Sequence, residues 1–229
     1  MNLLSRRQKG AIEPSALRSL YKTEAYVPPV AANSRLGIVG YDYEYPDLKD
    51  QVRFRYLFAS HLNALPETVT FESINLEAPA GFTSQRANLF AEYTAALTYP
   101  LPITFYRGNG VRLPSFGARK VVPGANDAIE QWLKYANEQD NNPHTIGLIS
   151  EGTRERSLPL EYMDTVCELF RRLSVRGTSV LVPSGDQGVG SGNDLKFSPN
   201  FPASCRCGFQ TLSENCTQTQ VAHRTAIIS

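Results

Sequence analysis

The sequence predicts an α/β fold, a doubly wound, mostly parallel sheet with helices on both faces. Five apolar, β-branched runs alternate along the chain with four stretches in which apolar residues recur at helical spacing. Strands joined by helices in this way pair in parallel through right-handed crossovers. With 229 residues, of which 41% are hydrophobic, the chain is long enough to bury such a core in one domain.

The expected elements follow one another in a regular order. Residues 1–34 are polar and proline-marked, and we expect a leader segment that packs on the domain, with a short helix beginning at Pro14. A buried strand is predicted at residues 35–41, followed by a helix at 47–62. The next helix opens on Ser84, a residue type favoured at N-caps. The remaining elements are strands at 68–74, 102–108, 144–150 and 178–184 and helices at 84–99, 126–139 and 160–173.

Charge and composition exclude several classes of partner. The chain has 23 Lys plus Arg against 22 Asp plus Glu, so no net field attracts nucleic acid or an anionic membrane. It contains neither a run of about 18 apolar residues nor the apolar stretch of a signal peptide. We therefore expect no nucleic acid and no membrane as partner, and the residues give no indication of oligomeric state. One domain is expected over residues 35–205, with an irregular tail at 206–229, where periodicity is lost.

The four cysteines are Cys167, Cys205, Cys207 and Cys216. They are too few for a disulfide scaffold, and the spacing in CRC is too short for a zinc knuckle, so no metal site is indicated. Cys167 lies in the last predicted helix, and the last predicted strand returns beside that helix. A disulfide between Cys167 and Cys205 is one hypothesis, and two buried thiols are the other.

A glycine-rich turn, LVPSGDQGVGSGND at residues 181–194, follows the last strand. A phosphate cradle needs a lysine or a helix N-terminus to hold negative charge, whereas this turn begins with Asp186 and has no lysine before Lys196. Taken alone, the glycines permit positive φ and Asp186 caps a turn. The turn lies where open α/β sheets collect catalytic groups, beyond the carboxyl ends of the strands.

The segments around this turn form a recognisable set. RGTSVLVPSGDQGVGSGND is followed by FSPNFPASC, and IEPSALRSLYKTEAYVPPVAANSRLGIVGY, LTYPLPITFY and YMDTVCELFRRLSVRGTSVLVPSGD fit the same pattern. Over residues 12–205 the chain resembles the sedolisins, serine-carboxyl peptidases of the tripeptidyl-peptidase type found in fungi. The resemblance implies a subtilisin-like fold, of which the C-terminal part is not expected in this chain.

The resemblance also implies a set of catalytic groups. Sedolisins use a Ser nucleophile, a Glu general base, an Asp that orients the Glu, and a second Asp in the oxyanion hole. A carboxylate base stays ionised at low pH, where an oxyanion-hole Asp keeps the proton that it must donate. Asp186 matches the oxyanion-hole position of the family.

The general base and its partner are replaced in this chain. The family helix reads like E-A-N-L-D-x-Q-Y, with its two carboxylates four residues apart on one face. Here RANLFAEY puts Arg86 at the Glu position and Phe90 at the Asp position. Glu92 lies about 200° round the helix from Phe90 and cannot substitute for it. Arg86 is interpreted as a solvated helix residue or, alternatively, as a contact for a peptide carboxylate.

Other family features depart as well. The nucleophilic Ser lies in a G-T-S segment downstream of F-P-A-S in the family, and no such segment follows Cys205, while the GTS at residues 177–179 precedes Asp186. We expect no cofactor, because the family calcium site is not present in this chain. The residues that the resemblance assigns to substrate binding are Ser150, Glu151, Gly152, Ser184 and Gly185.

Three interpretations of function follow. The chain is a partial sedolisin-type serine peptidase domain, with acid endopeptidase or tripeptidyl-peptidase activity in the family but inactive here. Alternatively, it is a non-catalytic peptide-binding module or a misassembled gene-model fragment with no function of its own. A peptide or protein is the partner that the resemblance implies. The family is extracellular or lysosomal, although this chain carries no signal peptide, so its compartment stays open.

Overall fold

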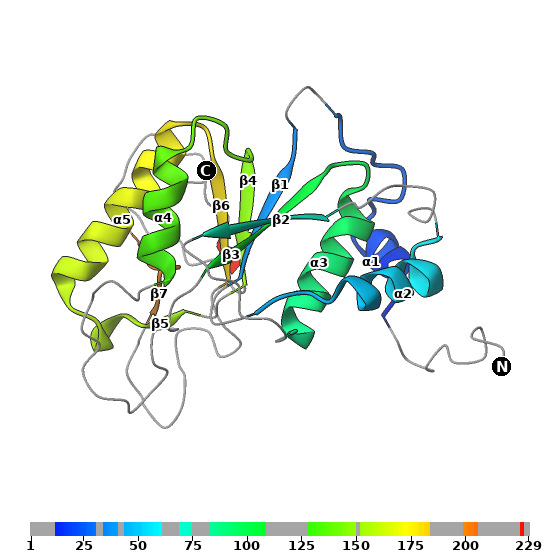
Figure 1. Ribbon diagram of the computed structural model, residues 1–229, viewed down its shortest axis with the longest axis horizontal. Coiled ribbons are helices and arrows are strands. Elements are labelled where there is room, and N and C mark those ends of the chain that lie inside the picture. The colour runs from blue at the N-terminus through cyan, green and yellow to red at the C-terminus, as the bar shows by residue number, and fades with distance from the viewer. Residues whose placement is uncertain are drawn as a thin grey trace.

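The computed structural model describes residues 12–30, 34–40, 44–60, 69–74, 83–108, 128–149, 152–183, 199–205 and 225–226. A six-stranded sheet runs through the middle of the domain in the order β2-β3-β1-β4-β6-β8. The first five strands of that order pair in parallel, and β8 pairs antiparallel with β6. Helices α4 and α5 cover one face of the sheet, and α1, α2 and α3 cover the other (Figure 1). The predicted fold class is confirmed.

The elements alternate as the sequence predicts, with small shifts at their ends. The helices are α1 (Pro14–Leu20), α2 (Leu48–Phe58), α3 (Gln85–Thr98), α4 (Ala128–Glu138) and α5 (Leu160–Val175), together with the short 3-10 helix η3 (Glu155–Ser157). The strands are β1 (Leu36–Gly40), β2 (Val69–Ile74), β3 (Ile103–Gly108), β4 (Thr145–Leu148), β5 (Thr153–Arg154), β6 (Ser179–Pro183), β7 (Asn200–Phe201) and β8 (Thr225–Ala226).

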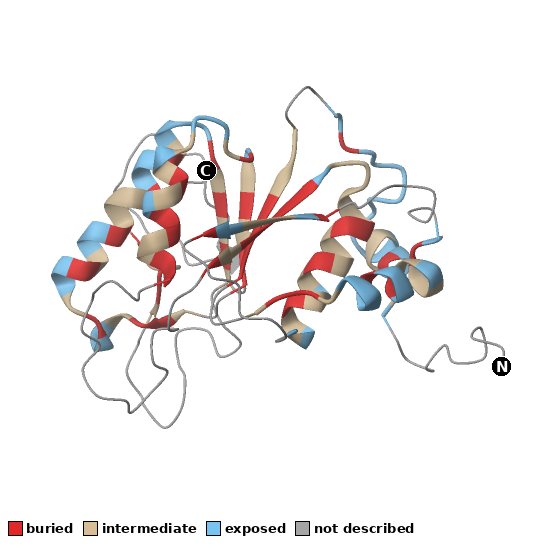
Figure 2. Ribbon diagram, viewed as in Figure 1, coloured by how far each residue is buried: buried red, intermediate tan, exposed pale blue. Residues whose placement is uncertain are grey.

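Successive side chains of the central strands pack on opposite faces of the sheet. On β1, Ile38 joins the core under α2 and α3, while Val39 joins the core under α4 and α5. On β3, Phe105 and Tyr106 divide in the same way. The period of two in a strand dictates this division. Both faces are therefore apolar, and the strands are largely buried (Figure 2).

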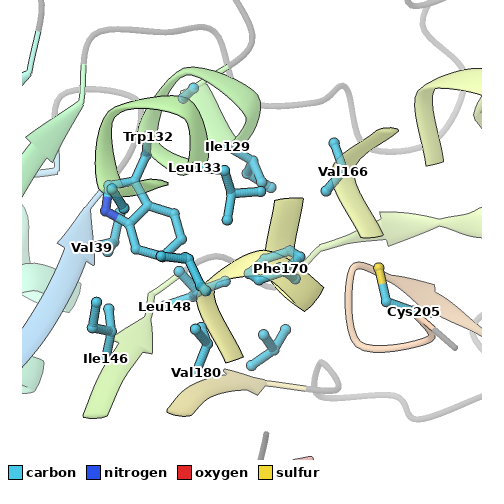
Figure 3. Close-up of a cluster of buried hydrophobic side chains, with 14 of the residues drawn as sticks. Val39, Ile129, Trp132, Leu133, Ile146, Leu148, Val166, Phe170, Val180 and Cys205 are labelled. Carbon is cyan, nitrogen blue, oxygen red and sulfur yellow. The ribbon is translucent and has the colours of Figure 1, made fainter. Parts of the chain in front are cut away.

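The larger core lies between the sheet and helices α4 and α5. Trp132 of α4 and Phe170 of α5 are fully buried with ring centroids 6.3 Å apart, and they pack above β-branched and leucine side chains of the strands (Figure 3). The opposite core is lined by small residues of α3, among them Ala87, Ala91 and Ala95, which let the helix approach the sheet closely. Phe54 of α2 closes that core from outside.

The first described segment is tied to α3. The Tyr93 hydroxyl donates to the Ile12 carbonyl at 2.5 Å, and Arg18 of α1 donates to the Leu97 carbonyl at 3.2 Å. Pro14 occupies the first turn of α1, where the missing N–H of proline costs nothing. The short helix predicted from Pro14 is thus present, and it packs on α3.

Helices α2 and α3 both begin with a side-chain cap, and they lie side by side. The Asp47 carboxylate accepts from the Lys49 N–H at 2.7 Å, and the Ser84 hydroxyl accepts from the Ala87 N–H at 3.3 Å. The N-cap predicted at Ser84 is confirmed. Asn88 joins the two helices, since its amide accepts from the Asp47 N–H at 2.6 Å and donates to Asp50.

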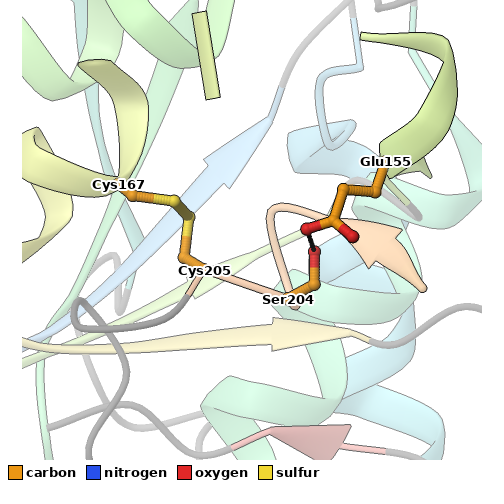
Figure 4. The surroundings of a disulfide bond; sticks show 4 residues. All are labelled: Glu155, Cys167, Ser204 and Cys205. Atoms are coloured by element: carbon orange, nitrogen blue, oxygen red, sulfur yellow. Dashed lines mark hydrogen bonds between the residues drawn. A yellow bond between two sulfur atoms is a disulfide. The ribbon is translucent and has the colours of Figure 1, made fainter. Parts of the chain in front are cut away.

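A small second sheet and a disulfide hold the segment near Cys205 against α5. Strands β5 and β7 pair antiparallel, and Cys205 bonds to Cys167 of α5 (Figure 4). The disulfide is therefore confirmed over the alternative of two buried thiols. Strands β5 and β7 have two residues each, too few to show a period, which is why the sequence pattern missed them.

The first prediction concerns this disulfide. Cys167→Ala/Cys205→Ala removes a cross-link that closes a stretch of 38 residues, so the unfolded chain regains conformational freedom. We expect the free energy of unfolding to fall by about 2–4 kcal/mol, measured by urea denaturation. Reduction of the native protein should match the double variant. A variant as stable as the native protein would contradict the prediction.

The second prediction concerns Glu92, which is half-buried on α3. Burial, with the Asp50 carboxylate nearby, raises the pKa of Glu92 from 4.5 to about 7. Because this pKa is higher in the folded state, the stabilising contribution of Glu92 is complete below pH 4.5 and is lost as the pH rises through about 7. Glu92→Gln should remove this dependence and raise the free energy of unfolding at neutral pH by about 1 kcal/mol, a value reduced for solvent screening.

The matched control for this measurement is Glu138→Gln, at an exposed carboxylate on α4. Denaturation of the native chain and both variants across the range from pH 4.5 to about 7 gives the comparison. The control should keep the native pH dependence, and identical profiles for the two variants would show that Glu92 carries no such effect.

Candidate active site

The carboxyl ends of the parallel strands meet at one edge of the sheet. Strands β1, β3, β4 and β6 end there at Gly40, Gly108, Leu148 and Pro183, and helices α2 and α3 begin near it (Figure 1). Open α/β sheets bind ligands at this edge. Asp186, Ser184 and Gly185, which follow β6, lie outside the described residues, so their predicted roles stay predictions.

The start of α3 is anchored to the segment that leaves β1. The Ser84 N–H donates to the Tyr45 carbonyl at 2.8 Å, and Tyr45 forms an isolated parallel bridge with Thr83. These contacts bring the first turn of α3 to the carboxyl edge. Arg86 and Phe90, the positions at which the family resemblance expects carboxylates, both lie in the first half of α3.

Arg86 is paired with a carboxylate. Its Nε lies 4.0 Å from the Glu44 Oε1, and the side chains of Arg86 and Glu44 are 34% and 22% exposed. Arg86, expected as a solvated helix residue or as a contact for a peptide carboxylate, is thus partly exposed and lies beside an acid. Residue 44 follows β1 and residue 86 opens α3, so the fold, not sequence proximity, creates this ion pair.

Phe90 has joined the hydrophobic core. It is partly buried and packs against the cluster that contains Ile38, Phe54 and Phe105. Glu92, two residues further on, is half-buried, and burial together with the Asp50 charge raises its pKa. Its predicted position on the face away from Phe90 stays a prediction.

Gly152 is the one described member of the predicted segment Ser150, Glu151 and Gly152. Its φ is +78°, and a Cβ at this position would lie 2.4 Å from the Phe201 carbonyl oxygen. Only glycine fits such a close approach at positive φ. The backbone of residue 152 is therefore pressed against β7, and whether it contacts a substrate remains a prediction.

A serine and an acid are in contact near the disulfide. The Ser204 hydroxyl donates to the Glu155 Oε1 at 3.0 Å, next to the Cys167–Cys205 bond (Figure 4). The Glu155 N–H also donates to the Pro199 carbonyl at 3.0 Å. Both bonds join η3 to the segment around β7. Sequence reasoning missed the pair because nothing in the pattern relates two residues 49 positions apart.

Arg107 is a further side chain at this edge. Its guanidinium lies 5.6 Å from the Tyr45 ring centroid and 5.2 Å from that of Phe71. Its Nη2 donates to the Ser73 hydroxyl at 2.9 Å. Residues 109–127, which follow β3, lie outside the described residues.

Within the described ranges, no three His, Cys, Asp or Glu side chains gather as a metal site would require. Among the helices of those same ranges, none has the length and apolarity to cross a bilayer.

Comparison with known proteins identifies the fold and the relatives. No family model matches the chain. Tripeptidyl-peptidase SED4 of Arthroderma otae is 34% identical over 207 residues, which cover 85% of this chain and 34% of the relative. Probable tripeptidyl-peptidase SED3 of Arthroderma benhamiae is 32% identical, with the same two coverages. The chain thus spans about a third of the length of the curated relatives that it matches.

A solved structure has the same fold. Pseudomonas sedolisin, a serine-carboxyl proteinase complexed with two molecules of pseudo-iodotyrostatin, superposes with a TM-score of 0.54 at 18% identity and covers 84% of this chain and 51% of that chain. The fungal sequence matches and the shared sheet agree with the motifs from which the sequence predicts the family. Over most of its length the chain is thus similar to fungal tripeptidyl-peptidases, and it shares the fold of a solved sedolisin, a serine-carboxyl proteinase.

Proposed function

We propose that this chain is a sedolisin-family domain that holds peptide segments at the carboxyl edge of its sheet without hydrolysing them. The observation that carries the proposal is on α3, where Arg86 pairs with Glu44 and Phe90 packs into the core. A guanidinium is always protonated and accepts no proton, and a benzyl group has no oxygen. The general base and its orienting acid are thus both without an equivalent on this helix.

The size of the expected effect follows from the chemistry of serine hydrolases. Loss of one member of a triad lowers kcat by a factor of about 10⁴, and further losses within the same unit add little. Glu92 offers no substitute, because at 100° per residue it lies about 200° round the helix from Phe90. The relatives are named tripeptidyl-peptidases, so we propose that peptides remain the ligand class while hydrolysis is lost.

The third prediction tests this proposal. Purified chain, incubated at about pH 3 to 5 with a fluorogenic tripeptide substrate, should release no fluorophore above the rate of the buffer, because no base activates a hydroxyl. A sedolisin with its carboxylates intact serves as the positive control under the same conditions.

Turnover by this chain would contradict the proposal, and three variants would locate its source. Loss of turnover in Asp186→Asn alone would assign the activity to the oxyanion-hole position. Loss in Ser204→Ala and Glu155→Gln would assign it to the hydrogen-bonded serine and acid near the disulfide.

We also propose that the chain functions in an oxidising compartment, outside the cell or in a lysosome. The Cys167–Cys205 disulfide supports this, because structural disulfides rarely persist in the reducing cytosol. Mass spectrometry of protein from its native source, alkylated before lysis, provides the test. Two alkylated thiols at these positions would overturn the proposal.

A further inference from the structure

Arg107 lies near the carboxyl end of β3, at the edge where the parallel strands of the sheet end. We infer that its guanidinium is the anchor of a binding site for a carboxylate group of a peptide. The inference rests on the proposed function, because it names the chemistry by which the domain selects a peptide. No catalytic group of the family resemblance falls at this position.

The guanidinium is held in place before any ligand arrives. It lies over two aromatic rings, 5.6 Å from the Tyr45 centroid and 5.2 Å from the Phe71 centroid, and its Nη2 donates to the Ser73 hydroxyl. These contacts come from two segments other than β3: Tyr45 follows β1, and Phe71 and Ser73 belong to β2. Stacking on aromatic faces fixes the plane of an arginine side chain and removes part of its hydration. A preorganised cation loses little conformational entropy on binding.

The charge of Arg107 lacks an acidic partner within the described part of the chain. No ion pair to a carboxylate of those residues lies within 4.0 Å, and the Nε is buried without a hydrogen-bond acceptor. Arg86, the other arginine at this edge, differs because Glu44 offsets its charge. A partly buried cation without an anion is energetically costly. A ligand that carries an anionic group can form the ion pair that Arg107 does not form with these residues, and binding is favoured by that ion pair.

A carboxylate fits this site better than other anions do. It is planar and forms two parallel hydrogen bonds with a guanidinium, and the flanking rings give apolar contact to a peptide chain. Phosphate sites usually add several backbone N–H groups or lysines, and the described residues around Arg107 contribute aromatic rings and a serine instead. The carboxylate can come from an acidic side chain or from the C-terminus of a peptide, and the experiment separates these two sources.

The fourth prediction measures binding of three dye-labelled tetrapeptides by fluorescence anisotropy at about pH 6, where carboxylates are ionised. The first is Ala-Ala-Glu-Ala amide, the second is Ala-Ala-Gln-Ala amide, and the third is Ala-Ala-Gln-Ala with a free C-terminus. The full chain should bind a carboxylate-bearing peptide about tenfold more tightly than the neutral amide. Preference for the first or the third peptide identifies the source of the carboxylate.

Variants assign the preference to Arg107. Arg107→Met keeps an apolar side chain between the rings but removes the charge, and it should abolish the preference. Arg107→Lys keeps the charge without the planar fork and should retain part of it. Arg53→Met, at an exposed arginine of α2, is the matched control and should bind as the native chain does. Thermal melts within about 2 °C of the native value verify that each variant is folded.

The outcomes distinguish this inference from the proposed function. Binding of all three peptides with equal affinity would overturn the carboxylate site and leave peptide binding standing. A carboxylate preference that survives in Arg107→Met would overturn the assignment to Arg107. Failure of all three peptides to bind would overturn both ideas about binding, while the hydrolysis assay tests the loss of catalysis separately.

Discussion

The central strand β1 is the constraint on which the rest of this domain depends. It is hydrogen-bonded to β3 on one side and to β4 on the other, and its side chains pack into both hydrophobic cores. Its packing tolerates little change, since a Cβ at Gly37 would lie 2.8 Å from the Ile146 side chain and one at Gly40 would lie 2.6 Å from the Glu44 carbonyl oxygen. Beyond this strand, the Tyr45 carbonyl accepts a hydrogen bond from the Ser84 N–H, which ties the start of α3 to the segment after β1.

Two side chains of α3 are held near the carboxyl edge of the sheet by different interactions. The charge of Arg86 is offset by Glu44. The ring of Phe90 packs against the hydrophobic core. Both interactions stabilise the helix where it is.

The sequence predicts the elements whose signals are local. Periodicity gives every strand and helix of the main sheet up to β6, Ser84 gives the start of α3, and the chain path suggests the pairing of Cys167 with Cys205. The family resemblance assigns Arg86 and Phe90 to the dyad positions, but no pattern reveals what either residue contacts.

What the sequence does not predict depends on contacts between distant segments. Glu44 and Arg86 form an ion pair although they are 42 positions apart in the sequence. Arg107 of β3 contacts the rings of Tyr45, which follows β1, and Phe71 of β2. Strands β5 and β7 form only because the chain folds back on itself. Such contacts follow from the path of the whole chain, for which single-sequence periodicity carries no information.

The ring of Phe90 limits which side chains position 90 can accept. An aspartate there would place an ionised oxygen against the cluster that contains Ile38, Phe54 and Phe105, at a cost in stability. The core on this face of the sheet therefore favours an apolar side chain at position 90, whatever the domain binds.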